Sequence, residues 1–230
     1  MKIDRKAFRT LSSGLYVISS VAEDGRFCGC VVNTLLQVAS EPAQLLVSLN
    51  KQNATTSAVA GCERFCAGVL SQDATKELIG TFGFKSSKDI DKFAEFEHTV
   101  DGSGLPRLTQ DVLAIFEVSV DSMIDVGTHI VFIGTVQTAE VTGEGTPLTY
   151  DYYHRVMRGK TPAKAATYNG GDDATADENT VSEADAGEGK VGWRCKICGF
   201  TVEGYPDGLP ENWRCPMCGM GRDYFEKVLI

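Results

Sequence analysis

Long apolar runs and an excess of positive charge are both missing from this 230-residue sequence. No stretch approaches the roughly 18 consecutive apolar residues that a membrane-spanning helix requires. The first twenty residues mix apolar with polar side chains and lack the apolar core of a secretory signal, so we expect a soluble cytoplasmic protein. With 22 Lys and Arg against 31 Asp and Glu, the net charge of −9 disfavours nucleic-acid and membrane partners and favours a protein partner with a basic surface.

The sequence also lacks the character of a disulfide-stabilised secreted protein, although it contains eight cysteines. Disulfide frameworks occur in small exported chains, and this chain is neither small nor visibly exported. Four of the cysteines, Cys28, Cys30, Cys62 and Cys66, lie among small and apolar residues. Cys28 and Cys30 are two positions apart and would share one face of a strand. We interpret all four as thiols that pack in the interior.

The region from residue 1 to 165 has the pattern of a mainly β domain. Short runs of β-branched, aromatic and apolar residues, each bounded by turn residues, predict strands at 15–21, 26–32, 44–49, 65–70, 115–123 and 129–141. A series of this kind predicts a β barrel. Short helices are expected at 54–61 and 75–82, and Ile90, Phe93 and Ala94 give segment 86–96 helical spacing.

A change of composition follows at 166–189, and its acidic core is residues 170–189. These twenty residues contain seven carboxylates, no basic residue and one larger apolar residue, Val181. Such a segment buries too little apolar surface to offset its loss of chain entropy, so we predict a flexible tether. It would span about 25 Å on average and about 65 Å when extended, which would let the C-terminal part reach more than one place. The alternative is a spacer without that role.

The last part of the chain, residues 190–230, contains two matched CxxC pairs. Cys195 and Cys198 form the first pair, Cys215 and Cys218 form the second, and a glycine follows each pair. Two such turns supply four thiolates to one tetrahedral metal site, which by spacing alone suits zinc or iron. A high density of aromatic residues favours iron, because an apolar shell tunes a redox potential. These residues are Trp193, Phe200, Tyr205, Trp213 and Phe225.

This C-terminal segment resembles a rubredoxin. The match lies in CKICGF around the first pair and in LPENWRCPMCGMGRDYFEKV around the second. The sixteen residues between Cys198 and Cys215 are fewer than in a typical rubredoxin, while the four ligands are retained. The resemblance implies one redox-active iron held by the four cysteines.

The first domain lacks the glycine fingerprint of a Rossmann fold. The nearest string, DGSGL at 101–105, has no third glycine and no strand-to-helix context. A different feature suggests phosphate binding: the run SLNKQNATT at 48–56 gathers Lys51 with amide and hydroxyl groups ahead of the helix expected at 54–61. The same composition also suits a capped surface turn, and the sequence leaves both interpretations open.

The order of segments in residues 5–165 resembles the flavin reductase-like family, which binds FMN on a split β barrel. The matching strings are GLYVISS, CGCVVNTLLQVASEPAQLLVSLNKQNATT, GCERFCAGVL, DGSGLPRL, THIVFIGTV and PLTYDYYHRV. The resemblance implies that one segment runs along the isoalloxazine ring, namely Val31, Val32, Asn33 and Thr34. It implies that a second segment holds the ribityl chain and phosphate, namely Ser48, Leu49, Asn50, Lys51, Asn53 and Thr55.

The first domain departs from the family pattern at three positions and matches it at a histidine. Where the family usually has serine or threonine, this chain has Leu35, Leu36 and Ala39, so we do not expect the family's side-chain contacts to the flavin there, while its backbone contacts can persist. His129 matches the histidine of the family's GDH-like motif, which implies a catalytic position close to the flavin. The alternative for His129 is a histidine that bonds to backbone at the start of a strand.

Together the domains resemble flavin reductase and rubredoxin fusions, which in anaerobic bacteria pass electrons from NADH to a flavodiiron protein. The resemblance implies a homodimeric electron-transfer enzyme that takes hydride from NAD(P)H on FMN and passes single electrons through the iron. Two alternatives remain open from the sequence. In one, the C-terminal module is a structural zinc ribbon used for docking, and in the other, the first domain binds FMN without catalysis.

Overall fold

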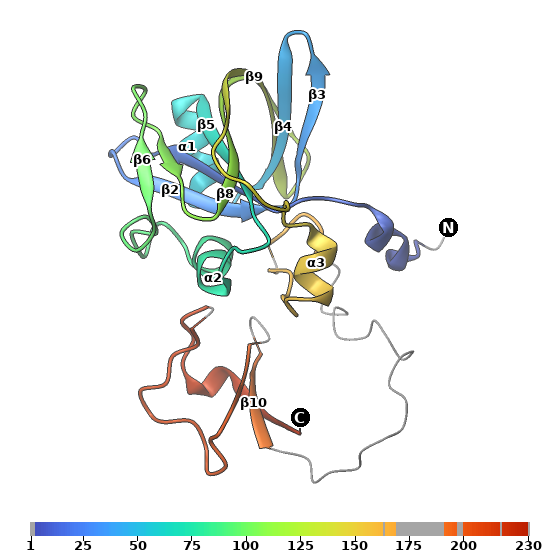
Figure 1. Cartoon of the computed structure of the whole chain (residues 1–230), viewed down its shortest axis with the longest axis vertical. Helices are drawn as coiled ribbons and strands as arrows, with labels where there is room; N and C mark the ends of the chain where they lie inside the picture. Colours follow the sequence, from blue (N-terminus) through green and yellow to red (C-terminus); the bar gives the residue numbers. More distant parts are fainter. Residues whose placement is uncertain (1–2, 163, 169–190, 197–199, 217, 230) are drawn as a thin grey trace.

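The computed structural model describes residues 3–162, 164–168, 191–196, 200–216 and 218–229. The chain has a larger N-terminal domain and a small C-terminal module (Figure 1). Most of the tether predicted at 166–189 lies outside the described residues. Within the described residues, no helix is long and apolar enough to cross a membrane.

A seven-stranded antiparallel sheet is the framework of the N-terminal domain, as the mainly β prediction requires. Its strand order is β2-β1-β5-β8-β9-β4-β3. The strands are β1 Tyr16–Val21, β2 Phe27–Val32, β3 Leu35–Ser40, β4 Ala43–Asn50, β5 Arg64–Leu70, β8 Val112–Asp125 and β9 His129–Val141. All six predicted strands are present. The sequence did not predict β3, an edge strand whose side chains are mostly exposed and so carry little apolar alternation.

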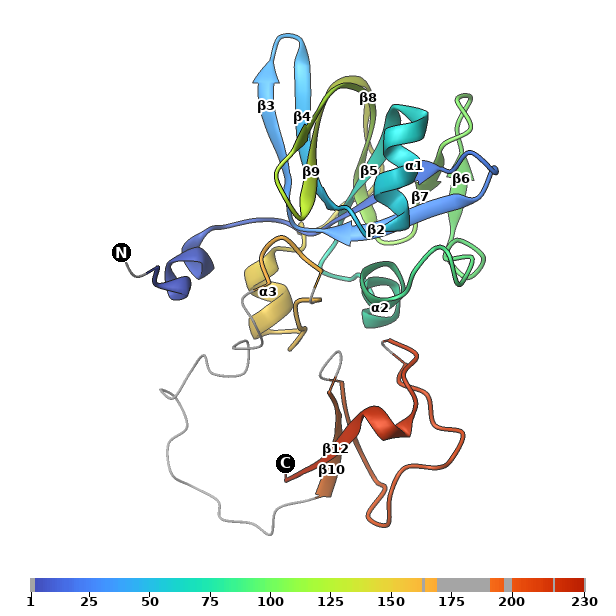
Figure 2. The same cartoon turned by 180° about the vertical axis from the view of Figure 1, so that it is seen from behind.

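The sheet curls into a barrel because its longest strand bends. β8 shows two register shifts against β9, one after Glu117 and one after Val120. Bulges of this kind bend a strand and increase its twist. Gly134 of β9 faces this region, where an added Cβ would clash with the backbone of Ser119. The close approach of the two strands therefore requires glycine, and the resulting barrel is visible from both sides (Figures 1 and 2).

Three short α-helices pack against the barrel, and each begins at a residue whose side chain caps it. With their N-cap residues in brackets, they are α1 Ala54–Cys62 (Asn53), α2 Lys76–Phe84 (Thr75) and α3 Tyr150–Arg155 (Thr149). The first two confirm the helices predicted at 54–61 and 75–82, and α3 was not predicted. α2 and α3 lie between the sheet and the C-terminal module in both views (Figures 1 and 2).

The helical spacing at 86–96 gave a wrong prediction, because this segment forms turns. Side chains bond to nearby backbone N–H groups, Ser86 to Lys88 and Asp91 to Phe93, and so compete with helical hydrogen bonds. Lys92 is also buried there. Its Nζ donates to the carbonyl oxygens of Gly29 at 2.8 Å and Phe82 at 3.2 Å. Loss of solvation lowers the pKa of Lys92 to about 8.

Two hydrophobic clusters stabilise the N-terminal domain. One lies inside the barrel and includes Ile18, Phe65 and Phe132. The other packs α2 and α3 against the sheet and includes Phe82 and Leu148. The short strands β6 His98–Val100 and β7 Pro106–Leu108 form a separate hairpin, and a 3-10 helix covers Arg5–Thr10.

Three of the four cysteines outside the CxxC pairs occupy interior positions, as predicted. Cys28, Cys30 and Cys66 are buried, and Cys62 is half-buried. Burial raises the pKa of the Cys66 thiol to about 12 and also raises the pKa values of Cys28 and Cys30. The three buried thiols therefore stay protonated and act as small apolar side chains.

The C-terminal module has a sheet and a core of its own. Its strands are β10 Val191–Cys195, β11 Thr201–Glu203 and β12 Phe225–Leu229, in the order β11-β10-β12, and a 3-10 helix covers Arg222–Tyr224. The buried members of its hydrophobic cluster are Cys195, Leu209, Cys215, Cys218 and Phe225. Three of these are predicted metal ligands, so the small core is built around the cysteines.

Candidate flavin cavity and metal centre

A cavity of about 80 Å³ opens where the ends of β2 and β4 meet α2 and α3. Nine of the eleven residues that the sequence analysis assigned to the flavin line it. They are Val31, Val32, Asn33, Thr34, Ser48, Leu49, Asn50, Asn53 and His129. They come from strands that are not neighbours in the sequence, and the barrel brings them to one place.

The cavity combines apolar walls with a few hydrogen-bonding groups. Leu15, Ile79 and Phe84 supply apolar surface, while Asn33 and Asn50 supply amides. A planar ring with apolar faces and polar edges needs this combination. The chemistry of the lining residues therefore fits a flavin.

A segment close to the tether completes the cavity. Thr161, Pro162, Lys164, Ala165 and Ala166 are part of its lining. Asn33 Nδ2 donates to Thr167 Oγ1 at 3.0 Å, and Asn50 Nδ2 donates to the Lys164 carbonyl oxygen at 2.9 Å. Two amides predicted to face the flavin therefore also bind this segment.

His129 is buried at the start of β9 and lines the cavity. Its Nδ1 lies 2.8 Å from Thr128 Oγ1. Loss of solvation lowers the pKa of His129 below its usual 6.5, and a hydrogen bond to the Lys164 carbonyl oxygen opposes that shift. The imidazole is therefore neutral at pH 7. Both sequence interpretations describe part of this arrangement, since His129 bonds to backbone and also faces the cavity.

Lys51 and Thr55 are the two assigned residues that do not line the cavity. Lys51 lies in the loop between β4 and α1, where its Nζ forms an ion pair with Asp125 Oδ2 at 2.5 Å. Thr55 is fully buried in the first turn of α1. Their neighbours Asn50 and Asn53 do line the cavity. The predicted loop therefore lies at the cavity, although Lys51 itself is ion-paired with Asp125 of the same chain.

Sequence reasoning missed the residues that α2 and α3 contribute to the cavity. Ile79, Gly83 and Phe84 come from α2, and Tyr150 and Tyr153 come from α3. The aromatic residues of α3 belong to a string that matches the family, but the sequence analysis predicted no helix there. Its capping residue, Thr149, directly precedes the string and was the available signal for a helix there.

The glycine-containing string DGSGL has a structural role. Asp101 Oδ1 accepts hydrogen bonds from the backbone N–H groups of Ser103 and Leu105, each at 2.8 Å. These bonds close the turn between β6 and β7. The rejection of a Rossmann fingerprint at this string is thus confirmed.

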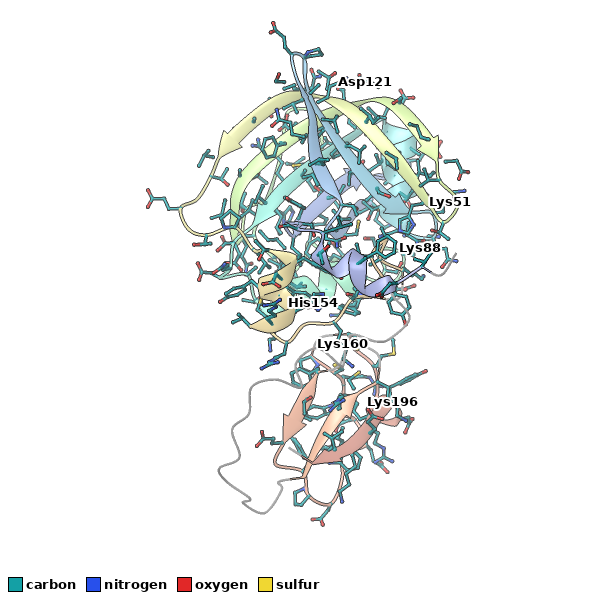
Figure 3. All side chains as sticks on the ribbon, turned by 90° about the vertical axis from the view of Figure 1, so that its right-hand side faces the viewer. Lys51, Lys88, Asp121, His154, Lys160 and Lys196 are labelled. Atoms are coloured by element: carbon teal, nitrogen blue, oxygen red, sulfur yellow. The ribbon has the colours of Figure 1, made fainter. Side chains whose placement is uncertain are left out.

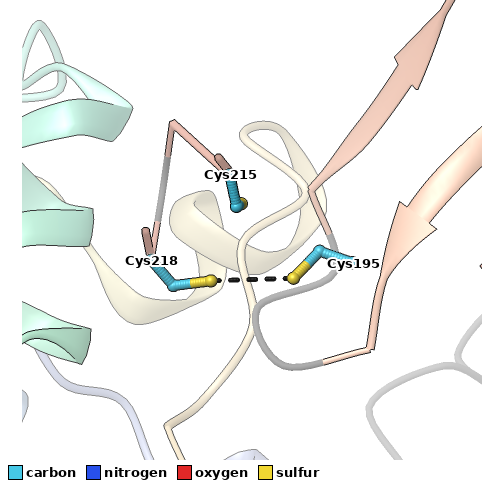
Figure 4. A group of neighbouring side chains, drawn as sticks. All are labelled: Cys195, Cys215 and Cys218. Carbon is cyan, nitrogen blue, oxygen red and sulfur yellow. Dashed lines mark hydrogen bonds between the residues drawn. The ribbon is translucent and has the colours of Figure 1, made fainter. Parts of the chain in front are cut away.

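Three of the four predicted metal ligands converge in the C-terminal module. The Sγ atoms of Cys195, Cys215 and Cys218 all lie within 4.8 Å of one another (Figure 4). All three residues are buried, and Cys195 Sγ lies 3.6 Å from Cys218 Sγ. Cys198 lies outside the described residues. Within the described residues the group of potential ligands consists of buried cysteines, which fits a tetrahedral iron centre.

The second cysteine loop has the geometry that its glycine predicts. Gly219 has a φ of 74°, a conformation that side chains with a Cβ rarely adopt. Its N–H donates to the Cys215 carbonyl oxygen at 2.8 Å, and the Cys215 N–H donates to the Met220 carbonyl oxygen at 2.9 Å. These bonds hold the loop that presents Cys215 and Cys218.

The predicted aromatic shell surrounds the cysteine cluster. Trp193, Phe200, Tyr205 and Trp213 pack against it, and Phe225 is one of its buried members. Trp193 Nε1 donates to the Tyr205 carbonyl oxygen at 2.7 Å. Ring pairs in edge-on geometry join Tyr205 to Trp213 and Trp213 to Phe225. The shortened segment between the two CxxC pairs therefore still supplies an aromatic core.

Comparison with known protein families agrees with both sites. The flavin reductase like domain matches residues 8–159. The chain belongs to the flavin reductase-like family. The rubrerythrin, rubredoxin-like domain matches residues 193–226 of the same chain. That span includes the four cysteines and the aromatic shell, which decides between the iron and zinc that spacing alone left open.

Relatives reproduce both the fusion and the first domain alone. A high molecular weight rubredoxin from Moorella thermoacetica is 39% identical over 98% of this chain and 100% of its own length. An NAD(P)H ferric-chelate reductase from Archaeoglobus fulgidus is 40% identical over 72% of this chain and 98% of its own length. The flavin reductase of styrene monooxygenase from Pseudomonas putida S12 superposes with a TM-score of 0.54 and 28% identity, covering 63% of this chain and 90% of its own.

These findings establish what kind of protein the chain is. This flavin reductase-like protein is an NAD(P)H-dependent flavin oxidoreductase with a C-terminal rubredoxin-type iron site. Its two redox groups are a flavin in the first domain and an iron in the C-terminal module, and its function is electron transfer through both.

Proposed function

We propose that FMN in the cavity accepts hydride from NAD(P)H and that single electrons then pass through the iron to a separate redox protein. The observation that carries this proposal is that one chain contains both a cavity suited to a flavin and a cysteine cluster suited to an iron. The cavity has the apolar and amide lining of a flavin site, and the C-terminal module has a buried thiolate cluster. A flavin converts two-electron chemistry with a nicotinamide into one-electron chemistry with an iron.

The protein's own residues have separate tasks in this scheme. We propose that residues 31–34 and 48–55 hold the FMN, with Asn33, Asn50 and Asn53 as donors to its polar groups. His129 faces the same cavity as a neutral imidazole. In that state it can donate or accept one hydrogen bond beside the flavin, but it adds no positive charge. We therefore assign His129 to positioning the nicotinamide or the flavin edge.

Lys51 offers a test of where the FMN phosphate binds. If the loop between β4 and α1 holds the phosphate, Lys51→Glu replaces an attraction by a repulsion and weakens FMN binding by about 1 to 3 kcal/mol. Riboflavin has no phosphate and should bind equally well to both proteins. Fluorescence titration of the flavin-free protein with each ligand measures the difference.

The ion pair of Lys51 with Asp125 supplies the matched control. Asp125→Asn breaks the same pair but leaves the lysine charge in place. FMN should then bind at least as tightly as in the unmodified protein. If Asp125→Asn and Lys51→Glu weaken FMN and riboflavin equally, the loop acts only through its conformation and does not hold the phosphate.

The external acceptor and the oligomeric state belong to the same proposal. We propose a flavodiiron protein as the acceptor of single electrons and a homodimer as the assembled form. Reoxidation of the reduced protein by a flavodiiron protein under anaerobic conditions, with nitric oxide present, tests the first point. Sedimentation of the FMN-loaded protein at micromolar concentration tests the second, and a monomer that keeps its FMN would contradict it.

The number of electrons that the protein accepts tests the function as a whole. FMN takes two electrons and one rubredoxin-type iron takes one, so complete reduction needs about 1.5 equivalents of NAD(P)H per chain. Anaerobic titration followed in the visible spectrum gives this number. An end point near one equivalent, with the iron still ferric, would mean that the iron lies outside the path. No reduction of the flavin would mean that the first domain only binds it.

A further inference from the structure

Phe84, the last residue of α2, contacts both candidate redox sites. Its side chain lines the flavin cavity beside Ile79 and Gly83. It also packs against the hydrophobic cluster of the C-terminal module that contains Cys195, Cys215 and Cys218. Among the described residues, Phe84 is the one member of the first domain that packs in that cluster.

The residue after Phe84 approaches the second cysteine loop. A Cβ placed on Gly219 would lie 4.0 Å from Lys85 Cε, which is an ordinary van der Waals separation. Gly219 directly follows the ligand Cys218. Figure 4 shows the cysteine group beside the pale green ribbon of α2, and Figure 3 shows Lys160 at the side of the first domain that faces the module. The end of α2 therefore lies against the loop that carries two metal ligands.

We propose that the C-terminal end of α2 is the docking surface on which the rubredoxin-like module collects electrons, and that Phe84 is its positioning residue. This inference rests on the proposed path from flavin to iron. Electron transfer slows steeply as the gap between two centres widens, and a packed side chain bridges that gap better than water does. Phe84 has an apolar contact on each side of the gap, so it keeps the cysteine cluster close to the cavity.

The electron balance requires that the iron be reoxidised between two successive transfers from the flavin. Hydride delivers two electrons to the flavin, while the iron accepts one, changing from ferric to ferrous. A one-electron acceptor outside the chain must therefore remove the first electron before the iron can collect the second. Reoxidation of the flavin returns its protons to solvent, and no bond forms between the two centres. A contact centred on one aromatic side chain also permits the module to leave and dock again between the two transfers.

Phe84→Ala tests the docking role in the full-length protein. In stopped-flow experiments at saturating FMN and NAD(P)H, the phase in which the iron is reduced should slow by about tenfold, because truncating a central aromatic contact reduces the docked population. Phe84→Leu keeps an apolar contact and should recover most of the rate. Ile90→Ala removes an exposed side chain from the following segment and should behave like the unmodified protein.

A second measurement follows the contact without any flavin. Hydrogen exchange of the iron-loaded, flavin-free protein should be faster at residues 213–220 and at the end of α2 in Phe84→Ala than in the unmodified protein. Exchange within β5 should stay the same, because that strand is hydrogen-bonded between β1 and β8 in the sheet of the first domain. Oxidation of chemically pre-reduced iron by ferricyanide should also be unchanged, which separates docking from damage to the iron site.

The outcomes separate this inference from the proposed function. Iron reduction at the normal rate in Phe84→Ala would overturn the positioning role, whether or not exchange becomes faster. Unchanged exchange at residues 213–220 would overturn the docking surface. If NAD(P)H reduces no iron even in the unmodified protein, the proposed function fails, while the exchange result still decides whether the module docks on α2.

Discussion

Replacement of Cys215 by alanine should weaken iron binding by about a hundredfold and remove most of the visible absorbance of the ferric site. Structural zinc in zinc-finger peptides contributes about 10 to 16 kcal/mol to folding, so on the same scale one of four ligands accounts for about 3 kcal/mol. Cys215 is buried in the cluster with Cys195 and Cys218, and the group of potential metal ligands that the described residues form there consists of these cysteines. Metal analysis and the visible spectrum of the purified protein measure the loss.

The loss should be confined to the C-terminal module. The barrel has hydrophobic clusters of its own, so FMN binding and the unfolding of the first domain should not change. Cys62→Ala is the matched control, since Cys62 is a half-buried cysteine of the first domain and should leave the ferric spectrum intact. Stoichiometric iron with a normal spectrum in Cys215→Ala would show that Cys215 is not a ligand.

Cutting the chain near residue 187 should make reduction of the iron slow and dependent on concentration. If residues 170–189 act as the flexible tether that their composition predicts, they hold the module at an effective concentration near millimolar. After the cut, at micromolar protein, transfer from flavin to iron should fall by about a hundredfold or more. A protease site inserted at that position, cleaved after purification, allows the same preparation to be measured before and after.

Two control measurements show whether the cut acts only on transfer from flavin to iron. Flavin reduction by NAD(P)H should keep its rate after the cut, because the cavity is formed by the first domain together with residues 161, 162 and 164–167. Addition of free module should restore iron reduction in proportion to its concentration. An iron rate that is unchanged and independent of dilution would mean that the two parts stay bound without the tether.

The metal centre, most strands of the sheet and most of the flavin residues could be predicted from the sequence, because they depend on local spacing or on a family match. The cysteines of the metal centre follow from two CxxC pairs, and the structure brings Cys195, Cys215 and Cys218 together. Six of the seven strands of the sheet follow from short apolar runs. Nine assigned flavin residues line one cavity because the resemblance supplied their order along the barrel.

The parts that the sequence did not predict depend on packing between distant segments. Nothing near Phe84 shows that it meets the cysteine cluster more than a hundred positions later. Lys51, in the loop after β4, is paired with Asp125 at the end of β8, which the run SLNKQNATT does not reveal. The segment at 86–96 has helical spacing but forms turns. The buried Lys92 side chain donates hydrogen bonds to two carbonyl oxygens outside the segment, and the spacing does not reveal these contacts.

The order in which the two groups are reduced tests the central claim most directly. In anaerobic stopped-flow mixing with NAD(P)H, we expect the flavin absorbance to fall first and the ferric band to fall afterwards, read at a wavelength where flavin does not absorb. In the flavin-free, iron-loaded protein the ferric band should persist. Iron that is reduced before the flavin, or at the same rate without any flavin, would contradict the proposed path from NAD(P)H through flavin to iron.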